Sequence, residues 1–190
     1  MILSLLKYFA RYPQKAGVLS MFANGESLLP GYADLIAHIK NLPDPLIPQI
    51  ESYVFGQSHD TVKKRVDTIT GIYLFVDFGE FSSSRDARNS ILDTQKIAVT
   101  IATKLSDTAD MVEEAIASNL TLQILSKLRR HLISDAESRT VPWMETMSSN
   151  HDIIPFVSPE FKSIGWTIMF DISASDIFGM KPLIQSFQED

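Results

Sequence analysis

The sequence has no cysteine among its 190 residues. Disulfide bonds, a thiolate nucleophile and a zinc site with sulfur ligands are therefore excluded. No stretch reaches the roughly 18 apolar residues that a membrane-spanning helix needs. The apolar N-terminus carries its positive charges after the apolar part, whereas a signal peptide carries them in front. We therefore expect a cytoplasmic protein that has no membrane partner.

Recognised catalytic motifs are also missing. The chain has no Gly-x-Ser-x-Gly elbow, no P-loop and no Gly-x-Gly-x-x-Gly. His59 and His151 each precede an aspartate, but adjacent residues of an extended chain point in opposite directions. Asp77 and Asp171 lie in apolar strands and could pair as buried carboxylates, although solvent-facing positions are commoner for aspartate. We expect no catalytic residue, no metal site and no cofactor, so the chain is interpreted as a non-enzyme.

The chain has fewer basic than acidic residues. The chain has 17 Lys and Arg against 23 Asp and Glu, and its formal net charge is −6. A protein that coats nucleic acid needs a basic surface to neutralise phosphates, so we expect no specific nucleic-acid partner. The hydrophobic fraction of 45% and the charged fraction of 21% are typical of a globular protein.

Proline marks the clearest internal boundary. Three prolines fall within residues 42–48 and predict an extended, semi-rigid segment. Before it, apolar residues recur at helical spacing in 1–12 and 31–41, which predicts two short helices. We therefore divide the chain into an N-terminal helical segment with a Pro-rich connection, residues 1–48, and an α+β core domain, residues 49–190.

Alternating apolar residues predict the strands of the core domain. The strongest run is 71–81, which is apolar on both faces, as expected for a central strand. Weaker patterns predict four further strands, at 50–55, 96–104, 153–157 and 164–172, and residues 62–70 fit either a strand or a helix.

One long amphipathic helix is predicted from a cap at Ser106 or Asp107 to about Ser134. Its apolar stripe is wide enough to lie across a sheet, and acidic residues gather at its start and basic residues near its end. The predicted fold is α+β, with a mostly antiparallel central sheet of four to five strands packed by this helix and with short N-terminal helices.

Two features suggest contact with other proteins. Residues 82–95 are polar and read as a long loop, and long loops tend to be functional. The candidate interaction residues in this loop are Ser82, Ser83, Ser84, Arg85, Asp86, Arg88 and Asn89. Its two arginines suit phosphate or an acidic partner surface, and solvated loop charge is the alternative. Trp143 is a candidate interface anchor, and equally a residue that fastens a loop to the core.

The order of helix, strands, long loop, strand, long helix and strand resembles the small tail-terminator and tail-completion proteins of tailed bacteriophages. The matching stretches are 71–78, 96–104 and 107–131. The resemblance implies a non-enzymatic hexameric ring subunit at a tail end or head–tail junction. Its partners would be copies of itself and other tail or connector proteins, in the bacterial host cytoplasm or in the virion.

Three other functions stay open at this point. One is an adaptor of a related contractile or secretion assembly, which has the same sequence features. Another is a small metal-dependent hydrolase, which requires His59, His151 and nearby carboxylates to converge in one pocket. The third is a monomeric ligand-binding α+β module, which requires a deep apolar pocket and no large exposed apolar patch.

Overall fold

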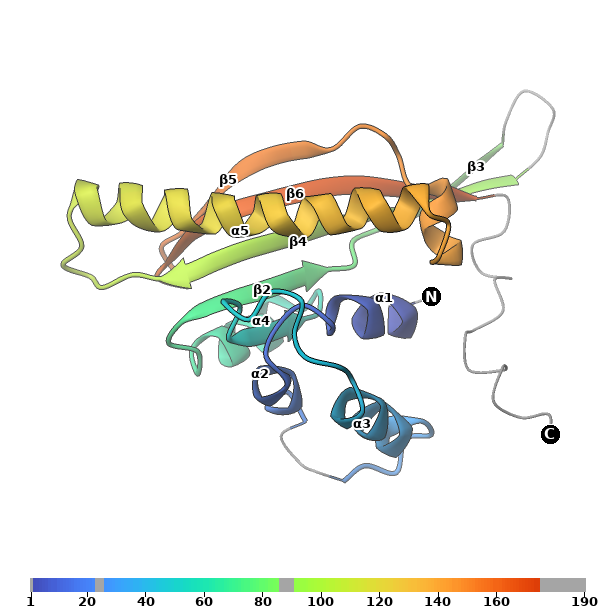
Figure 1. The fold of residues 1–190 in the computed structure, drawn as a ribbon, viewed down its shortest axis with the longest axis horizontal. Helices are drawn as coiled ribbons and strands as arrows, with labels where there is room; N and C mark the ends of the chain where they lie inside the picture. Colours follow the sequence, from blue (N-terminus) through green and yellow to red (C-terminus); the bar gives the residue numbers. More distant parts are fainter. Residues whose placement is uncertain (1, 23–25, 86–90, 175–190) are drawn as a thin grey trace.

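The computed structural model describes residues 2–22, 26–85 and 91–174. A single curved sheet carries helix α5 along one face (Figure 1). The helices are α1 (Ile2–Phe9), α2 (Lys15–Leu19), α3 (Tyr32–Lys40), α4 (His59–Val66), α5 (Met111–Glu137) and the 3-10 helix η1 (Pro142–Thr146). The strands are β1 (Ser52–Phe55), β2 (Ile72–Asp77), β3 (Phe81–Arg85), β4 (Ile91–Lys104), β5 (Asp152–Ser158) and β6 (Ser163–Ala174).

The sheet follows the order β1-β2-β4-β6-β5, with β3 paired to the first part of β4. Strands β1 and β2 are parallel, and the other pairs are antiparallel. The predicted class, α+β with a mostly antiparallel sheet and one long helix, is therefore confirmed. The sheet has six strands in the described residues, one more than the upper prediction.

The predicted loop at 82–95 is wrong for most of its length. Residues 81–85 form β3, and β4 begins at Ile91, so one strand pairs with β3 over 91–95 and with β2 over 98–103. Gly79, with a φ of +57°, lets the chain turn between β2 and β3. The loop prediction failed because the side chains of residues 82–85 are all exposed, and an exposed strand needs no apolar alternation.

Helix α5 begins later than predicted. Its cap is Asp110, whose carboxylate accepts hydrogen bonds from the backbone of Val112 and Glu113, both at 2.9 Å, and Glu113 returns the bond to Asp110 N. This is a capping box, and it satisfies donors that the first turn leaves free. Ser106 and Asp107 instead lie in the preceding turn. The helix also runs on to Glu137, so its basic residues lie before the last turn.

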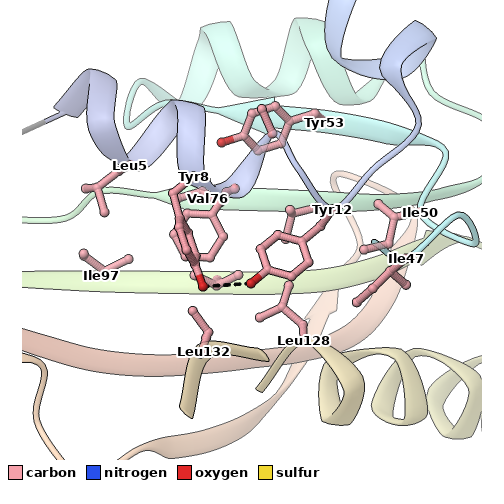
Figure 2. Close-up of a cluster of buried hydrophobic side chains, with 14 of the residues drawn as sticks. Leu5, Tyr8, Tyr12, Ile47, Ile50, Tyr53, Val76, Ile97, Leu128 and Leu132 are labelled. Carbon is pink, nitrogen blue, oxygen red and sulfur yellow. Dashed lines mark hydrogen bonds between the residues drawn. The ribbon is translucent and has the colours of Figure 1, made fainter. Parts of the chain in front are cut away.

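One hydrophobic core joins the N-terminal segment to the sheet and to α5. Leu5 and Phe9 of α1 are fully buried with Leu128 and Leu132 of α5. Figure 2 shows α1, the sheet and α5 meeting around Tyr8, whose hydroxyl lies 2.8 Å from that of Tyr12. The core therefore crosses the Pro-rich connection at 42–48, which itself contributes buried Leu42 and Ile47.

Helix α4 covers the second face of the sheet over β1 and β2. Of residues 62–70, which fitted either a strand or a helix, residues 62–66 are therefore helical as part of α4. Val62 and Val66 of α4 pack with Val54 and Tyr73. Further along this face, Met169 of β6 is 37% exposed. The long helix and the short helix α4 thus lie on opposite faces, and the β4–β6 part of the second face is more open to solvent.

Candidate interaction surfaces

A sheet edge is a ready template for another chain unless it is covered or disrupted. The outer edge of β1 is covered by α2. Gly17 of α2 packs so closely on the backbone of Glu51 and Ser52 that no Cβ would fit there. Arg65 of α4 reaches the same place and donates hydrogen bonds to Tyr53 O (3.3 Å) and Gly17 O (2.9 Å). This edge is closed.

The opposite edge, β5, contains Pro155 at its centre. Proline has no backbone N–H and is tolerated in a sheet where that position faces away from the neighbouring strand. A strand added to β5 would therefore lack a central hydrogen bond. Ile153, Ile154 and Val157 keep 41%, 44% and 68% of their surface exposed, so this edge offers apolar side chains but poor backbone pairing.

In the described residues, the outer edge of β3 is neither covered by a helix nor interrupted by a proline. Lys96 N–H donates to Glu80 O at 3.0 Å, which makes this a hydrogen-bonded pair of the ladder. Since such pairs alternate in antiparallel strands, Ser82 and Ser84 also bond to β4, and the amide of Ser83 points away from it. In the described residues β3 pairs with β4 alone. The β3–β4 arm extends past the end of the main sheet (Figure 1).

The candidate interaction residues therefore divide into two groups. Ser82, Ser83, Ser84 and Arg85 lie on β3, whereas Asp86, Arg88 and Asn89 fall outside the described residues. The open edge of β3 was missed by the sequence reasoning, which treated this stretch as a loop. The interruption at Gly79 between a strongly apolar strand and a polar stretch was the signal that could have indicated it.

Trp143 is not an exposed anchor. It lies in η1 with 4% of its surface exposed, and its ring meets Tyr8 edge to face at 5.2 Å between ring centres. The anchor prediction is therefore wrong as a description of the surface. The alternative holds, because Trp143 fastens the segment after α5 to the core.

The histidines do not converge. His59 lies on α4, where its Nε2 is 2.8 Å from Glu160 and its ring stacks on Phe161. His151 precedes β5 and packs against Phe170, whereas Glu160 follows the other end of β5. In the described ranges, no group of three or more His, Cys, Asp or Glu residues could hold a metal ion.

Asp77 and Asp171 line one shallow depression of about 400 Å³ on the second face, together with Lys96, Asp152 and Met169. They lie on β2 and β6, opposite Ala98 and Lys96 of the intervening β4, so their backbones are two strand spacings apart across the sheet, roughly 9–10 Å, and are also offset by two residues along it. That separation is too large for two carboxylates to share a proton. The Oδ1 atom of Asp77 instead accepts a hydrogen bond from Gly79 N at 2.9 Å.

His151 should make the stability of the protein depend on pH. Burial, and then the charge of Arg129, lower its pKa in the folded state. The unfolded chain therefore binds the proton at a higher pH, near 6.5, and the free energy of unfolding falls as the pH drops below that value. We expect His151→Gln to flatten this decline between pH 7.5 and 5.5 in urea titrations. If the free energy of unfolding declined equally with pH in the wild type and in His151→Gln, His151 would not be the cause of the decline.

Comparison with protein-family models, curated proteins and solved structures found no significant match. A search of the described helices for a membrane span found none with the required length and apolar character.

Proposed function

We propose that the chain is a non-enzymatic structural subunit of a phage or prophage tail or head–tail junction, which assembles as a ring through contacts between its own copies. The observation that carries this proposal is the contrast between the sheet edges. Among the described residues, the β1 edge is covered by α2 and Arg65 and the β5 edge is interrupted by Pro155, whereas the outer side of Ser82–Ser84 in β3 has no paired strand and lies on a projecting arm.

An open edge on a projecting arm suits a heterologous contact. The arm of one copy then meets a different surface of the next, and such contacts close into a ring when the rotation between copies allows it. Backbone pairing supplies affinity with little demand on the side chains, which fits the run Ser82–Ser84. The other partners would be the tail or connector proteins that stack on the ring.

The net charge of −6 also supports the proposal. A ring at a tail end or head–tail junction surrounds the path of DNA, and like charges keep DNA from binding to its wall. The separated histidines give no comparable support to a metal-dependent hydrolase.

Proline at position 83 tests the proposal. Ser83→Pro removes the one amide of the Ser82–Ser84 run that points away from β4, and it leaves the β3–β4 hydrogen bonds in place. We expect rings to be lost in electron micrographs and the particle mass from light scattering to fall to that of the ring's building block.

Ser83→Ala is the matched control, because it keeps the amide and removes the hydroxyl, and it should form rings like the wild type. Circular dichroism melting should show that both variants remain folded. Rings of Ser83→Pro as abundant as those of the wild type would contradict the role of β3. A wild-type protein that stays below ring mass at every concentration tested would contradict the ring itself.

A further inference from the structure

The outer face of α5 carries an apolar stripe that no part of the described chain covers. Val112, Ile116 and Leu120 recur every four residues and so lie on one side of the helix. Their exposed fractions are 65%, 64% and 42%, in contrast to the buried Ala117, Ile124 and Leu128 on the sheet side. Figure 1 shows α5 as the outermost layer on this side of the sheet. A contiguous exposed apolar patch of this kind marks an interaction site.

The charges along this outer face are sorted in a self-complementary way. Glu113 lies beside the start of the apolar stripe, and Lys127 and Arg130 follow its end. All three side chains are exposed. Neither Lys127 nor Arg130 has an ion-pair partner within residues 2–22, 26–85 and 91–174. The two ends of the stripe therefore carry opposite charges, and the basic end is unpaired by any described residue.

We propose that α5 of a second copy packs antiparallel across this face, about a two-fold axis near Leu120. Glu113 and Lys127 are each seven residues from Leu120, roughly 10 Å along the helix. The two-fold axis therefore places Glu113 level with the partner's Lys127, twice per dimer. The apolar stripes of the two copies meet across the axis.

Charge complementarity favours an antiparallel second copy over a parallel copy or an apolar peptide on this face of α5. In a parallel arrangement of two copies, Glu113 would face Glu113 and Lys127 would face Lys127, which is repulsive. A purely apolar peptide would leave Lys127 and Arg130 unused. The antiparallel copy covers the apolar stripe and pairs the opposite charges. It also places the two helix dipoles antiparallel to each other. The contact is isologous, and it is independent of the proposed ring, which needs a heterologous one.

The absence of cysteine makes the geometry directly testable, since any introduced cysteine is unique. Leu120→Cys, on the axis, should form covalent dimers under mild oxidation. Glu113→Cys and Lys127→Cys should each cross-link poorly alone, because like positions are 14 residues apart along the pair, roughly 21 Å. Mixed together, these two variants should cross-link to each other. Ser134→Cys, exposed on the same helix but far from the axis, is the control that should form no covalent dimer.

Charge exchange tests the pairing in the native dimer. Lys127→Glu places like charges opposite each other twice and should raise the dissociation constant at least about tenfold in analytical ultracentrifugation. The double variant Glu113→Lys with Lys127→Glu should restore dimerisation. Glu113→Lys also removes the bond from Asp110 N to the Glu113 carboxylate, but the two bonds that the Asp110 carboxylate accepts remain in both variants, and circular dichroism should show intact helix.

Two outcomes would overturn the inference: a Leu120→Cys variant that cross-links no more than Ser134→Cys, or a double variant as weak as Lys127→Glu alone. Either leaves the ring proposal standing, because Ser83→Pro acts on β3 and not on α5. Conversely, loss of rings in Ser83→Pro with Leu120→Cys dimers retained supports two separate contacts.

Discussion

Gly165→Ala should lower the free energy of unfolding by about 3 kcal/mol or more. Gly165 lies in β6, directly opposite Ala102 of β4 in the middle of the sheet. A Cβ atom there would overlap the carbonyl oxygen of Ile101 and come within 2.7 Å of Ala102 Cα. These are backbone atoms of a central strand and cannot rotate away, so the strands would have to separate. Urea unfolding followed by circular dichroism measures the loss.

Gly56→Ala is the matched control. A Cβ at Gly56 would meet only a side-chain methyl of Val62, at an ordinary 3.7 Å. The same methyl group added there should change stability by no more than about 0.5 kcal/mol. A Gly165→Ala protein as stable as Gly56→Ala would show that β4 and β6 do not approach as closely as described.

Trp143→Ala should lower the free energy of unfolding by about 3–5 kcal/mol, because it empties a large site in the core. The ring is 4% exposed and contacts Tyr8, which in turn contacts Tyr12 of the same aromatic cluster. Thermal and urea unfolding measure the effect. An exposed partner anchor would behave oppositely: its truncation would leave the stability of the subunit unchanged and weaken assembly.

Trp143→Phe separates volume from hydrogen bonding. The indole Nε1 of Trp143 is buried and has no hydrogen-bond partner in the described part of the chain. Phenylalanine removes that unsatisfied donor while it keeps most of the apolar ring, so the two effects oppose each other. We expect a loss of less than about 1.5 kcal/mol. A loss as large as that of Trp143→Ala would mean that Nε1 has a partner after all.

The elements that periodicity predicted are those that bury one regular face. Strand β6 alternates because one face packs on the core, β2 is apolar on both faces because both are covered, and α5 has a helical stripe because it lies across the sheet. The short helices α1 and α3 were found for the same reason. In each case the burial pattern is written into neighbouring residues, so local reasoning was sufficient.

Features that depend on residues far apart in the sequence were not predicted by this local reasoning. The arm of β3 and β4 has no apolar alternation, because Ser82–Ser84 are exposed and the buried residues of its β4 part, Asp93 and Gln95, are polar. The environment of Trp143 depends on Tyr8, which lies 135 positions earlier in the chain (143 − 8). Whether a sheet edge is open also depends on distant contacts, such as Arg65 with Gly17.

Composition and local pattern were thus enough to establish an α+β chain without cysteine, with a net negative charge and with a long helix over a mostly antiparallel sheet. Which strand edge stays open, and which apolar residues of α5 stay uncovered, emerged from the packing of the folded chain alone. The physical reason is that the exposure of a side chain depends on what packs against it in the folded chain, and not on the type of residue. Leu120 and Leu128 have the same side chain and lie two turns apart on one helix, yet only the fold buries the second and leaves the first 42% exposed.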